Sequence, residues 1–257
     1  MADLLSQLTG TASVSSQTTP LTEFSRNIHE YEESHDSNII FIDHFEKKVS
    51  VFGSYLYGST SSLSSEDAIN FVSKLREVGT DKNIDIIIHT TGGSLSAAET
   101  IINAISLHKG EIRVHIPYYA CSAGTLIALS ADKIIMHPYS YIGPVDPQYS
   151  FGVSATSISR FNESTSTSWV GDIVKLMRDD STRSMNRVEE LVLKICSTNS
   201  IHDGKFVCKE LASGKYNHDQ PIFYRDICEK KILTNVSDSL DEKIVEIFEQ
   251  RKGVYSK

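Results

Sequence analysis

The chain has 257 residues, of which 40% are hydrophobic and 23% are charged, so it can bury a core of ordinary size and is not a wholly disordered chain. Its 33 acidic residues outnumber its 25 basic residues, which gives a formal charge of −8 at pH 7. Because binding to nucleic acid relies on clustered Lys and Arg, this balance argues against a nucleic-acid partner.

The sequence carries no signal for a membrane or for export. Its longest apolar runs, such as 39–42, span about four or five residues, whereas a transmembrane helix needs about 20. The first residues have neither the basic start nor the continuous apolar stretch of a signal peptide. The four cysteines form no CxxC pair and are too sparse for a disulfide scaffold. We therefore expect a cytoplasmic protein with free thiols and no membrane span.

The N-terminal part is predicted to be less ordered than the rest. Residues 1–37 are expected to form a flexible polar tail, rich in Ser and Thr, ahead of one domain that spans 38–257. Two segments rich in β-branched and aromatic residues, 38–43 and 49–57, are predicted as strands. Ser64–Asp67 predicts the start of a helix, with acidic residues in its first turn.

Strands and helices alternate in the next part of the chain. Apolar strands are predicted at 84–88, 112–118 and 133–137. Gly92–Gly93 follows the first of these strands and Ala120–Gly124 follows the second, and each turn leads into an apolar helix. Alternation of this kind predicts an α/β fold built from parallel βαβ units with right-handed crossovers.

After Pro147 the pattern changes. The segment 154–168 is rich in Ser and Thr and is predicted to be a flexible loop or lid. From Val170 onward the apolar residues recur at helical spacing, with stripes at 188–195 and 244–248. We expect one α/β domain with a helical C-terminal part.

The two turns are predicted to share one crevice, because ligands of a parallel sheet bind beyond the carboxyl ends of its strands. Gly92 and Gly93 let the backbone approach a ligand, and N–H groups at a helix start could stabilise an oxyanion. A pair of glycines is also typical of a plain tight turn. Ser122 is either an exposed hydroxyl or a helix N-cap, which is the commonest use of Ser at that place. The neighbouring Cys121 is expected to be a small core residue.

Several motifs together resemble those of a known family. They are His89–Ser94, then Ala120–Thr125 about thirty residues later, then 130–136, 143–148 and 211–219. This set is similar to the ClpP/crotonase-like fold and, within it, to the serine dehydrogenase proteinase family, which is related to the SppA signal-peptide peptidases. The resemblance covers roughly residues 38–235. It implies a ClpP/crotonase-like spiral of βαβ units, assembled as a homo-oligomer, that acts on peptides or unfolded protein chains.

The resemblance also implies roles for individual residues. Ser122 is expected to be the nucleophile, and the backbone N–H groups of Gly93 and Ala123 are expected to form the oxyanion hole. One departure is Thr91, where related sequences usually have Pro. This change is expected to loosen the turn while leaving its glycines in place.

The general base is less well defined. ClpP-type enzymes use a His at a position that aligns here with Val145, so that His is missing. SppA-type enzymes use a Lys about fifty residues after the serine, and Lys175 lies 53 residues after Ser122. Its apolar neighbours Val174 and Leu176 could shield it from water, as a lysine base requires. The alternative is an ordinary exposed lysine on a helix.

Other residues are secondary candidates. Asp146 lies in the loop where the missing His would be, and it could orient a base or a water. His137 lies on the strand before that loop, where a structural role is expected. His218, followed by Asp219, could be catalytic or could brace a loop. The nine histidines show no metal-ligand spacing, so we expect no metal and no other cofactor.

The sequence therefore predicts a serine peptidase with a Ser–Lys pair. Two alternatives stay open. One is an acyl-CoA hydratase or thioesterase-like enzyme that uses the same oxyanion hole, because the fold alone does not fix the reaction. The other is a non-catalytic scaffold of the same fold that has lost its base.

Overall fold

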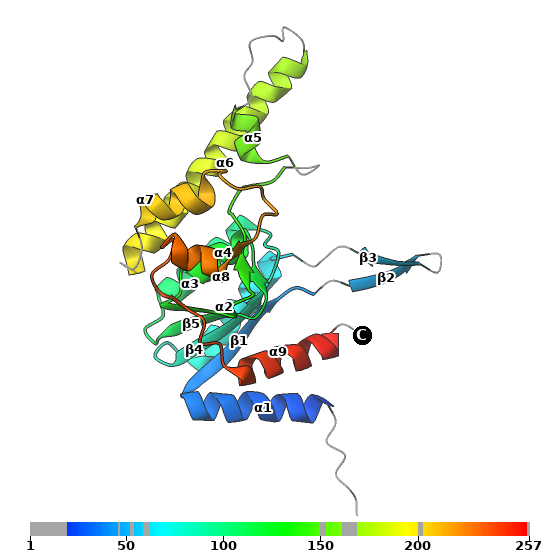
Figure 1. Ribbon diagram of the computed structural model, residues 1–257, viewed down its shortest axis with the longest axis vertical. Coiled ribbons are helices and arrows are strands. Elements are labelled where there is room, and N and C mark those ends of the chain that lie inside the picture. The colour runs from blue at the N-terminus through cyan, green and yellow to red at the C-terminus, as the bar shows by residue number, and fades with distance from the viewer. Residues whose placement is uncertain are drawn as a thin grey trace, which may run out of the picture.

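A five-stranded parallel sheet runs through the centre of the computed structural model, which describes residues 20–45, 47–51, 54–58, 62–149, 153–160, 169–199 and 203–255 (Figure 1). In spatial order its strands are β1 (Ser37–Asp43), β4 (Asn83–His89), β5 (Ile112–Ile116), β7 (Lys133–Met136) and β10 (Val236–Ser237). Every neighbouring pair is parallel. The predicted α/β class is therefore confirmed.

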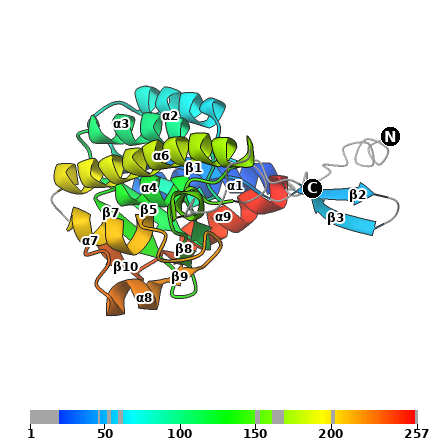
Figure 2. The same ribbon diagram turned by 90° about the horizontal axis from the view of Figure 1, so that it is seen from above.

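Two smaller sheets accompany the central one. A three-stranded sheet contains β6 (Tyr119–Ala120), β8 (Tyr141–Ile142) and β9 (Ile222–Phe223). A separate antiparallel pair contains β2 (Lys47–Val51) and β3 (Ser54–Gly58), and it extends away from the central sheet (Figure 2).

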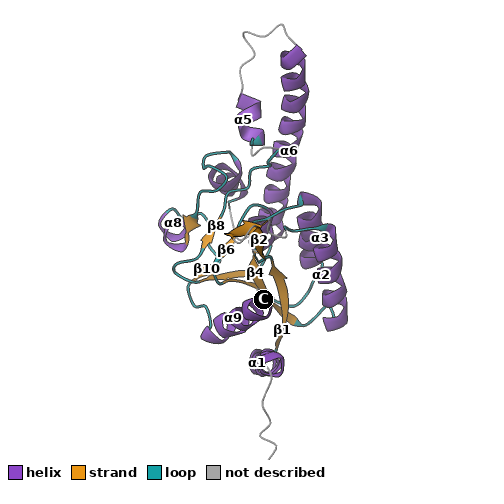
Figure 3. Cartoon of the chain, turned by 90° about the vertical axis from the view of Figure 1, so that its right-hand side faces the viewer, coloured by secondary structure: helices purple, strands orange, loops and turns teal. Residues whose placement is uncertain are grey.

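Helices cover both faces of the central sheet (Figure 3). They are α1 (Pro20–His35), α2 (Ser65–Val78), α3 (Leu95–Ser106), α4 (Ala123–Leu129), α5 (Ala155–Arg160), α6 (Trp169–Asn199), α7 (Gly204–Val207), the π-helical turn η2 (Cys208–Ala212), α8 (Tyr224–Glu229) and α9 (Glu242–Tyr255). Alternate residues of a strand point to opposite faces. Accordingly Ile86 and Ile88 pack with residues of α2, α3 and α4, whereas Ile87 packs with residues of α1 and α9. None of the described helices is both long enough and apolar enough to cross a bilayer.

Three predictions about local structure need correction. Residues 20–35 of the predicted tail form α1, because Phe24, Asn27 and Tyr31 recur at helical spacing and are buried there. The predicted strand 49–57 falls on the two antiparallel strands β2 and β3. The start of the predicted loop 154–168 contains the short helix α5. The rest of the predicted tail, residues 1–19, and most of that loop, 161–168, lie outside the described residues.

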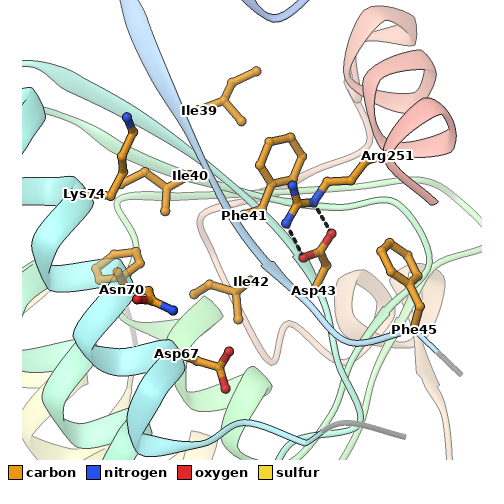
Figure 4. A pocket seen from close by; sticks show the side chains of 11 residues that line it. Ile39, Ile40, Phe41, Ile42, Asp43, Phe45, Asp67, Asn70, Lys74 and Arg251 are labelled. Atoms are coloured by element: carbon orange, nitrogen blue, oxygen red, sulfur yellow. Dashed lines mark hydrogen bonds and ion pairs between the residues drawn. The ribbon is translucent and has the colours of Figure 1, made fainter. Parts of the chain in front are cut away.

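The outer edge of β1 is unpaired with any described strand and borders a groove of about 520 Å³ (Figure 4). Residues 39–43 of β1 form its floor, and α2 forms one wall with Asp67 and Lys74. On the other side Arg251 of α9 donates from Nη2 to Oδ1 of Asp43 at 2.8 Å. At the start of the edge, the Ile39 N–H donates to Oε1 of Glu32 at 2.9 Å. Charged groups of α1 and α9 therefore engage this edge directly.

A buried carboxylate ties three neighbouring strands together. Asp85 of β4 is fully buried, and it accepts two hydrogen bonds of 2.7 Å from the Arg113 guanidinium of β5. His115 Nε2 lies 2.6 Å from its Oδ1, and the Ser37 hydroxyl of β1 donates to its Oδ2. Burial alone would raise the pKa of Asp85, but the hydrogen bonds from His115, Arg113 and Ser37 outweigh it and hold the pKa far below its usual range.

We predict that Asp85→Asn lowers the free energy of unfolding by about 3 kcal/mol at pH 7, because it leaves Arg113 and His115 without their carboxylate partner. Since the folded-state pKa of Asp85 is lowered, its contribution is complete above the unfolded value of about 3.9 and is lost as the pH falls below it. Urea unfolding should therefore show a smaller difference in the free energy of unfolding between wild type and variant at pH 3 than at pH 7. The exposed Asp81→Asn is the control, and an Asp85→Asn gap no larger than that of the control would contradict the prediction.

Candidate active site

Two strand-to-helix turns meet beside the C-terminal end of β4. The chain leaves β4 at His89 and enters α3 through Thr90–Gly93, and it leaves β6 and enters α4 through Cys121 and Ser122. Backbone hydrogen bonds join the turns, from Thr90 N–H to Tyr119 O at 3.3 Å and from Cys121 N–H to Thr90 O at 3.0 Å. The two turns line the same crevice, as the sequence predicted.

Only glycine fits at position 92. A Cβ there would lie 2.8 Å from both the Cys121 carbonyl oxygen and the Ser122 Cβ, and the φ of Gly92 is +103°. Because Gly92 has no side chain, the backbones of the two turns can pack directly against each other.

Ser122 has a backbone conformation that is rare for a residue with a side chain. Its φ is 51° and its ψ is −116°, and its side chain makes no capping hydrogen bond to α4. The structure therefore does not support the N-cap alternative. A strained serine between a strand and a helix is a recurrent way to present a nucleophilic hydroxyl, and strain of this kind clusters at functional sites.

Main-chain contacts position the amides of Gly93 and Ala123, which line the same cavity as Ser122. Leu63 N–H donates to Gly92 O and Ser94 N–H donates to Leu63 O, both at 2.8 Å, so the chain is held on each side of Gly93. Ala123 is the first residue of α4, where the N–H has no partner within the helix. Among the described residues, neither the Gly93 nor the Ala123 N–H donates to a backbone carbonyl. Both amides are therefore available to a bound oxyanion.

A cavity of about 590 Å³ opens at these turns. Its lining includes Gly93, Ser122 and Ala123 from the two turns, Val145 from the loop after β8, Arg187 from α6, and His218. Arg187 is paired with Glu99, to which its Nε donates at 2.8 Å. Segments that are far apart in the sequence therefore enclose the serine.

The two candidate bases lie differently with respect to this cavity. Lys175 is exposed and does not line it. It precedes the cavity-lining Ser184 on α6 by nine residues, or about 13 Å along the helix axis. His218 does line the cavity, and its Nδ1 is buried without a hydrogen-bond partner among the described residues.

Comparison with known proteins gives the family. A family model described as ClpP-like SDH-type serine proteinase matches residues 12–255. The chain belongs to this family. The family that the motifs resemble is thereby confirmed.

Relatives of this SDH-type proteinase include two proteins of Methanocaldococcus jannaschii. The uncharacterized protein MJ0137 is 32% identical over 88% of this chain and 77% of its own length, and the uncharacterized protein MJ1495 is 31% identical over 87% and 75%. ClpP1 from Listeria monocytogenes is a similar solved structure, at 17% identity over 71% of this chain and 90% of that chain, with a TM-score of 0.46. A mutant of the 1510-N membrane-bound stomatin-specific protease has 15% identity over 75% and 81%, with a TM-score of 0.47. Both structures are distant likenesses.

Two secondary candidates of this SDH-type chain lie away from the serine. Asp146 is buried and accepts a 2.9 Å hydrogen bond from the Thr156 hydroxyl, so it holds the start of α5. His137 accepts from the Tyr139 N–H at 3.2 Å in the turn after β7. Neither side chain lines the Ser122 cavity, whereas Val145, which aligns with the His of ClpP-type enzymes, does. No three His, Cys, Asp or Glu side chains within the described ranges are grouped as metal ligands.

The sequence analysis missed the polar groups behind the glycine turn. Thr90 is fully buried and its hydroxyl oxygen accepts from the Gly92 N–H at 3.0 Å. The same oxygen lies 2.7 Å from Nδ1 of His44, which follows β1. Because His44 and Thr90 are 46 positions apart, no local pattern could have paired them.

Cys121 is held in an environment that disfavours its thiolate. Burial raises its pKa to about 12, so the reactive thiolate is scarce. We predict that iodoacetamide at pH 8 modifies the exposed Cys228 of the native protein and spares Cys121. Mass spectrometry of the native protein and of a urea-unfolded sample, in which both thiols react, checks this. Rapid modification of Cys121 in the folded protein would contradict it.

Proposed function

We propose that this protein is a serine peptidase in which Ser122 is the nucleophile and the amides of Gly93 and Ala123 form the oxyanion hole. The observation that carries the proposal is the conformation of Ser122, whose φ of 51° places a non-capping hydroxyl at the start of α4, beside two amides without a backbone acceptor. Membership of the SDH-type serine proteinase family supports it.

The reaction follows from these groups. The Ser122 oxygen bonds to the carbonyl carbon of the peptide while a general base takes its proton, and the carbonyl electron pair moves onto the oxygen. The Gly93 and Ala123 N–H groups stabilise this oxyanion. When the intermediate collapses, the C–N bond breaks and the leaving amine takes the proton from the base. Water then hydrolyses the acyl-enzyme through the same steps.

Two side chains compete for the role of general base. Lys175 is the choice that the sequence spacing favours, but it is exposed and lies outside the cavity lining. It can serve Ser122 only if α6 moves or if a second copy brings its own Lys175 to the cavity. His218 needs neither, since it lines the cavity with Ser122.

We also propose that the protein acts in the cytoplasm, on peptides or unfolded chains, as a homo-oligomer. The position of α6 supports the last point. Its N-terminal part stands clear of the sheet (Figure 1), and Leu176 there is 72% exposed. A second copy packed on this part of α6 would cover that apolar side chain.

The nucleophile is tested with a fluorophosphonate probe, which phosphonylates activated serines. We expect wild type to be labelled and Ser122→Ala to be labelled at least about a hundredfold more slowly. Ser62→Ala removes another serine of the same cavity and should leave labelling unchanged. If wild type is not labelled, the non-catalytic scaffold becomes the better account.

The base is tested by comparing Lys175→Ala and His218→Ala, with His137→Ala as a histidine control outside the cavity. Loss of the true base should slow labelling about 10²-fold to 10⁴-fold, and the other two variants should stay near wild type. If Lys175 acts from a second copy, mixing inactive Ser122→Ala with inactive Lys175→Ala should restore part of the labelling. Normal labelling of both Lys175→Ala and His218→Ala would remove both residues from the mechanism.

A further inference from the structure

A series of polar groups, of which His44 and Thr90 are buried, ends on the glycine turn of the proposed active site. The Gly92 N–H donates to Thr90 Oγ1 at 3.0 Å, and this oxygen lies 2.7 Å from His44 Nδ1. On the far side of the ring, the buried His44 Nε2 faces the Asp67 carboxylate, with Oδ2 at 3.4 Å, close enough for electrostatic attraction but outside good hydrogen-bond geometry. The groups come from three elements, since His44 follows β1, Thr90 follows β4 and Asp67 belongs to α2.

The carboxylate end of this chain is itself fixed. Asp67 Oδ2 accepts from the Ser64 N–H at 2.7 Å and from the Ser64 hydroxyl at 2.6 Å, in the capping box that starts α2. Burial by itself would raise the pKa of Asp67, but the hydrogen bonds from Ser64, together with the neighbouring His44 ring, outweigh it and hold the pKa below its ordinary value. Asp67 is therefore ionised at neutral pH.

An ionised Asp67 gives the chain a direction. A carboxylate only accepts, so it favours the His44 tautomer that carries its proton on Nε2. In that tautomer Nδ1 is an acceptor, and the Thr90 hydroxyl donates to it. The Thr90 oxygen then turns a lone pair toward the Gly92 N–H. The direction of donation is thus the same along the series, from the Gly92 N–H to Thr90, from Thr90 to His44 and from His44 toward Asp67.

The location of these polar groups suits them to control the geometry of the glycine turn. His44 is 4% exposed and Thr90 is fully buried, so a broken link cannot be replaced easily by solvent. The Gly92 N–H that it holds lies next to Gly93, whose own N–H is one of the two proposed oxyanion donors. A donor displaced by about 1 Å costs an enzyme about 10²-fold in rate.

We propose that the Asp67–His44–Thr90 chain is a positioning device that sets the orientation of the Gly92–Gly93 turn and so of the oxyanion-hole amide. This inference rests on the proposed function, because it assigns a role within the same site. None of its three side chains lines the Ser122 cavity, so they act through the turn and not on the substrate.

The test measures the second-order rate of fluorophosphonate labelling in variants of Thr90. Thr90→Val removes the hydroxyl at nearly constant volume and should slow labelling about tenfold to a hundredfold. Thr90→Ser keeps the hydroxyl and should stay within about threefold of wild type. Thr156→Val is the matched control, because it also removes a buried hydroxyl, here the one bonded to Asp146, and Thr156 does not line the Ser122 cavity. It should lower the unfolding midpoint without slowing labelling.

A double-mutant cycle tests the link to α2 through a substitution at Asp67, whose side chain is partly exposed. Asp67→Asn should slow labelling about threefold to tenfold by itself, and it should add little when Thr90 is already Val, since the chain is then broken. Rate losses that multiply in the double variant would overturn the connection. So would a Thr90→Val rate equal to wild type, or a Thr156→Val variant slowed to the same extent.

Failure of the proposed function gives a different result. If wild type is not labelled at all, Ser122 is not an activated nucleophile, whatever supports the turn. In that case, amide hydrogen exchange tests whether the Asp67–His44–Thr90 series supports the turn, independently of catalysis. The Gly92 N–H should be protected in wild type and in Thr90→Ser, and it should exchange at least about tenfold faster in Thr90→Val. Equal exchange in all three proteins would overturn the chain as a support of the turn.

Discussion

The contact between the glycine turn and the serine turn is the constraint on which the site depends. Thr90 and Ala120 form a parallel β-bridge, and this bridge brings the turn after β4 against the turn after β6. The fit is close enough that Gly92 has no room for a Cβ next to Cys121 and Ser122. The serine and the nearby amides are therefore placed by main-chain hydrogen bonds, which no surface substitution can easily alter.

The opposite wall of the cavity is built differently. Val145, Arg187 and His218 reach it from a loop, from the middle of α6 and from a turn near the C-terminal part of the chain. Arg187 and His218 lie on a helix and a turn outside the described sheets, whereas the loop of Val145 follows β8, which pairs with β6. In the proposed mechanism, the turns that carry the oxyanion donors are thus fixed by main-chain hydrogen bonds, whereas access of a general base depends on the placement of α6 and of the turn with His218.

How much of this could be predicted differs from element to element. The strands β1, β4, β5 and β7 are evident because buried parallel strands are runs of β-branched residues, and the start of α2 is evident from its capping box. Helix α1 was missed because part of what stabilises it lies at the other end of the chain. Its buried Asn27 donates to Glu246 and to Gln250 of α9.

In the candidate site, too, features set by local sequence could be predicted, whereas features set by distant contacts could not. Gly92, Gly93 and Ser122 stand out as small residues in strand-to-helix turns. The roles of Ser122, Gly93 and Ala123 as nucleophile and oxyanion hole, however, were implied by the resemblance to a known family, since local chemistry alone favoured a plain turn and an N-cap. The role of His44 depends on a contact with Thr90 that only the folded sheet creates. Lys175 was chosen by its spacing from Ser122, but spacing along a chain does not tell how far a helix carries a side chain from the cavity.

The open edge of β1 has a consequence for the chain before it is fully folded. A strand edge that pairs with no described strand can act as a template for pairing between two incompletely folded molecules. In the finished protein, Glu32 of α1 occupies one edge amide, and the Asp43–Arg251 pair would have to shed water and separate before another strand could dock. Arg251 also covers the Phe41 ring, at 4.1 Å from its centroid. Helix α9 therefore helps to shield the edge of β1, and a nascent chain gains this protection after α9 has docked.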